Sequence, residues 1–133
     1  MAVAGWVLDK SAAARADDVR IASQLAELRR PLFVCPVGEL EQLYSARSGS
    51  DYDDMKATLH LGFVMLAAPP DVLERALRLQ HDLAHHHGMW HRIAIPDLLI
   101  TETALHHGFG VAHIDSDFER IAEVRPLTVA RLG

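Results

Sequence analysis

The chain has 133 residues, of which 50% are hydrophobic and 23% charged, so it has the composition of a soluble globular protein and room for a single core. Its formal net charge of −5 argues against a broadly basic nucleic-acid binder, and its arginines are spread along the sequence. The single cysteine, Cys35, excludes an internal disulfide and fits a reducing cytoplasm, where we expect it as a small buried thiol. We therefore expect one cytoplasmic domain spanning residues 1–133.

The amino-terminal segment "MAVAGWVLDK" contains a short apolar run without a preceding basic region. The run ends at Asp9 and is far shorter than the roughly 20 apolar residues that a membrane-spanning helix needs. It predicts a buried strand, and no other segment suggests contact with a membrane.

Short apolar runs alternate with longer amphipathic segments along the chain. The runs predict strands at 5–8, 32–35, 63–66, 110–114 and, as a fifth, 127–130. The segments between them predict two short helices within 11–29, one opening at Pro36, one over 48–61, a long one after Pro70, one over 95–108 and a short one over 117–124. Such alternation predicts an α/β sandwich, in which a parallel sheet of four to five strands is covered by helices on both faces.

Finer features of these helices can also be predicted. Asp17 or Asp18 is placed to cap the second short helix, and Gly108 to end the helix over 95–108. In the long helix after Pro70, the apolar residues expected on one side are Val72, Leu73, Ala76, Leu77 and Leu83.

Carboxylates from four distant segments are expected at one edge of this sheet. Binding sites in open parallel sheets form outside the carboxyl ends of the strands. Asp9 directly follows the first strand and Asp115 the fourth, while Asp97 lies in the first turn of a helix that enters from that side. Glu39 and Glu41 lie near the start of the helix after the second strand.

Such acids would repel one another or take up protons unless a cation joined them. An all-oxygen set of ligands suits Mg²⁺ or Mn²⁺, which can activate water and neutralise charge developing on a phosphate. Each acid also has a structural alternative. Helix capping, or a favourable interaction with the helix dipole, could explain Asp9, Asp97, Asp115 and Asp117. The two glutamates could be ordinary exposed helix residues. The combination, not any single acid, favours a metal site.

Four segments carry a resemblance to a known family. They are "VLDKSA" (7–12), "ELEQLYSAR" (39–47), "IPDLLITETALHHG" (95–108) and "HIDSDFERIA" (113–122). In this order they resemble PIN-domain proteins, most closely the VapC toxins of bacterial toxin–antitoxin pairs. The resemblance implies a three-layer α/β sandwich and a Mg²⁺- or Mn²⁺-dependent endoribonuclease that leaves a 5′-phosphate and a 3′-hydroxyl.

The resemblance also implies roles for individual residues. It gives the metal-binding positions to three aspartates: Asp9, Asp97 and Asp115. Glu41, before "QLYSA", matches the family's catalytic glutamate better than Glu39, which is the reserve choice. Ser11 matches a supporting hydroxyl, and Asp117 an additional acid beside the site.

Further expectations follow from the resemblance for partners. It implies an RNA substrate, a VapB-type antitoxin that blocks the acidic site, a homodimer, and contact with DNA only through the antitoxin. The alternative is a catalytically silent PIN-like module that acts by binding antitoxin or RNA, although such a module has no need of four clustered carboxylates.

The sequence departs from many relatives at Thr101, Glu102 and His113. Relatives often carry small alanines after "DLLI" and a threonine at the last of these positions. Because five residues along a helix correspond to about 140°, we expect Glu102 to point away from the site of Asp97.

The histidine-rich stretch "HDLAHHHGMWH" (81–91) also calls for an interpretation. Its two i, i+4 pairs, with the spacing of helical zinc sites, are His81 with His85 and His87 with His91. However, no glutamate occupies the metalloprotease position, and Gly88 would interrupt the helix between the pairs. A polar helix end and loop is the favoured interpretation, with Trp90 packed on the core.

Overall fold

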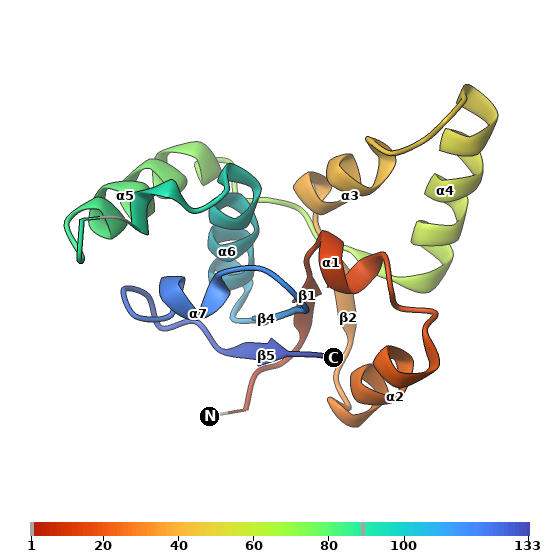
Figure 1. Cartoon of the computed structure of the whole chain (residues 1–133), viewed down its shortest axis with the longest axis horizontal. Coiled ribbons are helices and arrows are strands. Elements are labelled where there is room, and N and C mark those ends of the chain that lie inside the picture. Colours follow the sequence, from red (N-terminus) through yellow and green to blue (C-terminus); the bar gives the residue numbers. More distant parts are fainter. Residues whose placement is uncertain (1, 89) are drawn as a thin grey trace.

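The computed structural model describes residues 2–88 and 90–133 and contains a five-stranded parallel sheet (Figure 1). The strands are β1 (Trp6–Leu8), β2 (Leu32–Val34), β3 (Val64–Met65), β4 (Gly110–His113) and β5 (Val129–Arg131). Their order across the sheet is β3-β2-β1-β4-β5, and every neighbouring pair is parallel. The predicted α/β class and the fifth strand are therefore confirmed.

Helices separate consecutive strands, as the alternation predicted. They are α1 (Lys10–Ala13), α2 (Val19–Glu27), α3 (Pro36–Leu43), α4 (Gly49–Gly62), α5 (Val72–Ala84), the 3₁₀ turn η1 (Trp90–Arg92), α6 (Ile95–His107) and α7 (Phe118–Ile121). The fifth strand starts two residues later than predicted, because Leu127 packs into the core before the ladder with β4 begins at Val129.

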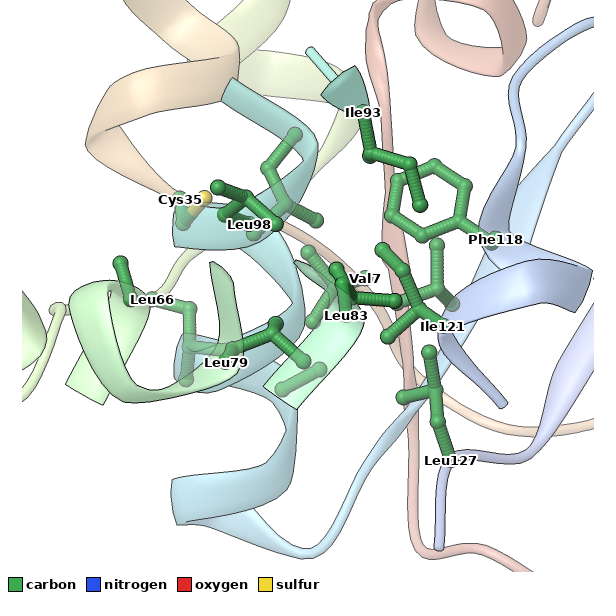
Figure 2. Packing of buried hydrophobic residues seen from close by; sticks show 14 residues of the cluster. Val7, Cys35, Leu66, Leu79, Leu83, Ile93, Leu98, Phe118, Ile121 and Leu127 are labelled. Atoms are coloured by element: carbon green, nitrogen blue, oxygen red, sulfur yellow. The ribbon is translucent and has the colours of Figure 1, made fainter. Parts of the chain in front are cut away.

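Strand β1 shows why the molecule has three layers. Val7 belongs to a buried cluster formed with α5, α6 and α7, which includes Leu83 and Phe118 (Figure 2). Trp6 and Leu8 point to the opposite face and join a second cluster formed with α1, α2 and α4. Alternate residues of a strand face opposite sides of a sheet, so this central strand is apolar throughout and buried on both faces.

Helix α6 fixes the geometry of the sheet's edge. It starts with Pro96 in its first turn and ends at Gly108, whose φ of 74° is the left-handed conformation that glycine adopts readily. Buried residues line it from Asp97 to Ala104. Because the helix is held along most of its length, Asp97 has a fixed place at its start.

The prediction for the buried side of α5 was partly wrong. Ala76 and Leu83 are buried as expected, together with Leu79, but Leu73 and Leu77 are 64% and 65% exposed. The side chains at positions 76, 79 and 83 form the stripe of α5 that packs against the core. Because successive residues of a helix are rotated by about 100°, Leu73 and Leu77 point away from that stripe. The apolar pattern was wider than the face that the fold buries.

Other sequence predictions at single residues are confirmed. Asp18 is the residue that caps α2, accepting from the amides of Arg20 and Ile21. Cys35 is a buried free thiol, and Trp90 packs against the core cluster. Within residues 2–88 and 90–133, no helix combines the length and apolar character needed to cross a bilayer.

Candidate active site

The site forms where the strand order changes direction. From β1 the chain proceeds to β2 and β3 on one side and, later, to β4 and β5 on the other. The edge of the sheet at the carboxyl ends of β1 and β4 is the usual place for a binding site in such a fold. Asp9 directly follows β1, and Asp115 lies two residues beyond the end of β4.

Three hydrogen bonds fix the carboxylate of Asp9, which is only 3% exposed. Its Oδ1 accepts from the Ser11 hydroxyl at 2.7 Å and from the Ala12 amide at 3.1 Å. Its Oδ2 accepts from the hydroxyl of Ser116 at 2.6 Å. Asp9 therefore caps α1, as the structural alternative proposed, and is also held in one orientation at this edge of the sheet.

The serine hydroxyls connect the two strand ends. Besides donating to Asp9, the Ser11 hydroxyl accepts from the backbone amide of Ile114 at 2.9 Å. Ser116, for which the sequence predicted no role, links Asp9 to the loop after β4. Its only signal in the sequence was its place between two aspartates in "DSD".

A series of hydrogen bonds between polar side chains supports the loop after β4. The amide of Ser116 donates to Nδ1 of His113 at 3.3 Å, and Nε2 of the same ring lies 3.0 Å from a carboxylate oxygen of Glu119. Arg131 donates to that oxygen at 3.3 Å. The fully buried His113 at the end of β4 thus has partners for both ring nitrogens, and they orient the loop that carries Asp115.

Asp97 experiences the strongest electrostatic effect at the site. The carboxylate is 9% exposed, and within the described part of the chain it receives no hydrogen bond. Burial raises the pKa of Asp97 to about 7, with further contributions from four acids nearby: Asp9, Glu41, Asp117 and Asp115. The fold therefore gathers the acids predicted from separate segments around Asp97.

The two glutamates of α3 have different surroundings. Burial raises the pKa of Glu41, and the negative charge of Asp9 raises it further against the opposing effect of Lys10. Burial also acts on Glu39, but hydrogen bonds from His60 and from Lys56, at 3.0 Å, outweigh it and leave its pKa lowered. Glu39 is thus engaged with α4, and Glu41 is the glutamate that lies near Asp9.

Asp115 and Asp117 form the open rim of the site. Both are exposed, and Oδ2 of Asp115 lies 3.7 Å from the guanidinium of Arg15. Asp117 occupies the position before α7 but accepts no capping hydrogen bond from that helix. Asp117 is therefore the N-cap residue of α7, as the structural alternative held, but its carboxylate makes no capping hydrogen bond and remains accessible from solvent.

Comparison with known proteins identifies the group to which this arrangement belongs. The sequence model of the PIN domain matches residues 4–124. The chain belongs to the PIN-domain family. It is 52% identical over 122 residues to the ribonuclease VapC17 of Mycobacterium tuberculosis, covering 91% of this chain and 90% of that protein. It is also 37% identical over 121 residues to the ribonuclease VapC21 of the same species, covering 90% and 87%. Within the family it therefore groups with the VapC proteins.

Solved structures share the fold of this PIN domain. The DNA-bound VapBC2 complex from Rickettsia felis contains a chain with a TM-score of 0.76 at 14% identity, over 97% of this chain and 99% of that chain. VapBC-5 from Mycobacterium tuberculosis gives a TM-score of 0.67 at 24% identity, also over 97% and 99%. These matches confirm the three-layer arrangement expected from the resemblance.

Glu102 lies outside the acidic site of this PIN domain, as its helical position predicted. It is 6% exposed, and Nε of Arg125 lies 3.7 Å from its Oε2. Burial raises the pKa of Glu102, and the nearby charges that affect it come from Arg125, from α5 and from Asp71 just before α5. The departure from other PIN domains at this position therefore leaves the set of acids around Asp97 unchanged.

Proposed function

We propose that this chain is the toxin of a VapBC-type pair, and that it hydrolyses RNA phosphodiester bonds at the acidic site with Mg²⁺ or Mn²⁺. The single observation that carries the proposal is the gathering of four acids around the buried carboxylate of Asp97, whose pKa rises to about 7 as a consequence of burial and of these neighbouring charges. Carboxylates are not gathered in this way for stability, because each charge raises the cost of the next. A divalent cation among them would remove that cost.

The donor set fits such an ion. Asp9, Asp97 and Asp115 offer only carboxylate oxygens, which hard cations such as Mg²⁺ and Mn²⁺ prefer. These three aspartates would hold the ion, and Asp117 would act beside them. When bound, a divalent ion lowers the pKa of water and neutralises charge that develops on the phosphate.

Side chains of this protein would supply the proton acceptor and hold the metal ligands in place. Glu41, with a raised pKa, would accept the proton of the attacking water. Ser11 and Ser116 would keep Asp9 in one orientation through the hydrogen bonds described above. As the oxygen of water bonds to phosphorus, the bond to the 3′ oxygen breaks, which leaves a 5′-phosphate and a 3′-hydroxyl.

The partners proposed are a VapB-type antitoxin, a second copy of the chain and, only through the antitoxin, DNA. The antitoxin is supported by the similar structures, which are VapBC complexes, two of them bound to DNA. The chain also has an apolar groove of about 770 Å³ between α1, α2 and α4, lined among others by Ala22, Leu25 and Met55. We assign this groove to the antitoxin.

We also propose that residues 1–133 form a single domain and that the protein is located in the cytoplasm.

Analysis of the new RNA ends tests the proposal against a silent binding module. Folded, antitoxin-free protein is incubated with RNA in Mg²⁺, and the products are ligated to an adaptor that requires a 5′-phosphate. The proposal predicts ligatable fragments that disappear with EDTA and with Asp9→Asn. RNA that is retained by the protein but yields no new ends would favour the binding module.

A further inference from the structure

We propose that His86, His87 and Glu123 form a second metal site, separate from the acidic one, for a borderline transition ion such as Zn²⁺. Each residue offers a ligand atom, and these atoms all lie within 4.8 Å of one another. His86 and His87 follow the end of α5, whereas Glu123 lies just beyond α7. The sequence suggested the i, i+4 pairs His81 with His85 and His87 with His91. Among the described residues, the histidines that lie together with a third ligand are instead the neighbours His86 and His87.

His86 has a buried nitrogen without a partner. Its Nε2 is inaccessible to solvent and makes no hydrogen bond to the residues that the structure describes. Buried polar atoms are nearly always paired, so this nitrogen calls for a ligand. Oε1 of Glu123 lies 3.7 Å from it, beyond hydrogen-bonding distance. Two ligands about 2.1 Å from one tetrahedral ion lie roughly 3.4 Å apart, which is close to this separation.

The turn after α5 brings the two adjacent imidazoles together. His87 has a φ of 63° and Gly88 one of 71°. A positive φ is uncommon for a residue other than glycine and often marks a functional constraint. The rings of His86 and His87 lie 4.4 Å apart, and each lies near Trp90, at 5.0 and 5.1 Å.

The donor atoms distinguish this site from the acidic one. Two imidazole nitrogens and one carboxylate oxygen suit Zn²⁺, whereas Mg²⁺ prefers oxygen alone. Zn²⁺ binds four ligands, so the three side chains leave one position for water or another small ligand. Arg120 lies on the neighbouring Trp90, with its guanidinium 5.6 Å from the centre of that ring.

An ion here would join two segments that reach the acidic site. The segment after α5 continues through η1 and Ile93 into α6, which carries Asp97 in its first turn. Helix α7 follows the rim acids, and its Phe118 belongs with Ile93 to the cluster of Figure 2. The expected role is therefore structural: the ion stabilises the packing of these two segments against each other.

Calorimetric titration of Zn²⁺ into untagged protein tests the site. Millimolar Mg²⁺ is present throughout, and Asp97→Asn serves as the background so that the acidic site does not contribute. We expect one Zn²⁺ per chain, at least tenfold weaker binding in His87→Ala, and no change in His81→Ala, an exposed histidine of α5. Cobalt should give the absorption of a tetrahedral nitrogen and oxygen site in the same variants that bind Zn²⁺.

A thermal melt separates loss of the ligand from loss of the fold. Zn²⁺ should raise the melting temperature of the Asp97→Asn protein but not that of the same protein with His87→Ala, while the two melt alike in EDTA. If the His87→Ala and Glu123→Gln proteins bind Zn²⁺ as tightly as their parent, or if the parent binds none, the site does not exist. Neither result depends on whether the protein cleaves RNA.

Discussion

Asp97 combines burial with several neighbours of its own charge, and this combination has a measurable consequence for stability. Its pKa is about 7 in the folded protein, against an ordinary value of 3.8. Between these values the folded state holds a proton that the unfolded state has lost. The free energy of unfolding of the metal-free protein therefore falls as the pH rises from about 4 to about 7.

Asp97→Asn should remove this pH dependence. In EDTA at pH 8 we expect the variant to be more stable than wild type by about 1–4 kcal/mol, and at pH 4 by little or nothing. Mg²⁺ should stabilise wild type at pH 8 and have a much smaller effect on the variant. Urea denaturation at the two pH values measures both effects, and an equal stability difference at pH 4 and pH 8 would contradict the account.

Ser116 acts on the metal site through Asp9, because its hydroxyl donates to the carboxylate oxygen that Ser11 does not contact. Ser116→Ala should weaken Mg²⁺ binding about tenfold or more and leave the fold intact. Ser45→Ala, which removes an exposed hydroxyl bonded to the carbonyl of Gln42, is the matched control and should bind Mg²⁺ normally. Isothermal titration with Mg²⁺ compares the two, and equal affinities would remove Ser116 from the site.

At the scale of elements, α3 carries two glutamates with different tasks. Glu41→Gln should reduce RNA cleavage by at least about 100-fold, because it removes the proposed proton acceptor. Glu39→Gln should leave cleavage close to normal and lower stability slightly, since its carboxylate contacts Lys56 and His60 of α4. Initial rates on one RNA, together with melting curves, test the assignment, and the reverse pattern of activities would make Glu39 the site residue.

Strand β4 can pair closely with β1 and β5 because it begins with glycine. A Cβ at Gly110 would lie 2.6 Å from a Trp6 ring carbon and 2.8 Å from the carbonyl oxygen of Thr128. Gly110→Ala should therefore cost about 1–3 kcal/mol in unfolding free energy. The control Gly62→Ala, at an open position of α4, should be neutral or stabilising by up to about 1 kcal/mol. Chemical denaturation that finds the two variants equal would contradict this description of the sheet.

The elements also show how far the sequence could predict the fold. Alternating apolar runs, Pro96 and Gly108 predicted the strand and helix order, because these features act locally. The buried side of α5 was partly mispredicted, since Leu73 and Leu77 are as apolar as the residues that the core accepts. Which part of a wide apolar stripe becomes buried depends on the neighbouring helix, and the stripe itself does not contain that information.

At the scale of the whole molecule, the candidate acids could be named from the sequence because strand ends of a parallel sheet share one edge. Their selection was less complete. Which of Glu39 and Glu41 belongs to the site could be decided by geometry only from the structure. There, Lys56 and His60 of α4 contact Glu39. Ser116 was missed because its contact with Asp9 spans 107 positions of the chain. The proximity of His86 and Glu123 could not be predicted either, because these residues are also far apart in the sequence.

Cleavage of a mixed RNA pool by wild type and Asp97→Asn, each in Mg²⁺, Mn²⁺ or EDTA, tests most simply whether the acidic site is a metal-dependent nuclease. Asp54→Asn, which changes an exposed acid of α4, is the control. We expect metal-dependent cleavage by wild type and by the control, none in EDTA, and a rate at least about 100-fold lower for Asp97→Asn. Intact RNA under every condition, from folded and antitoxin-free wild type, or equal cleavage by Asp97→Asn, would contradict this expectation.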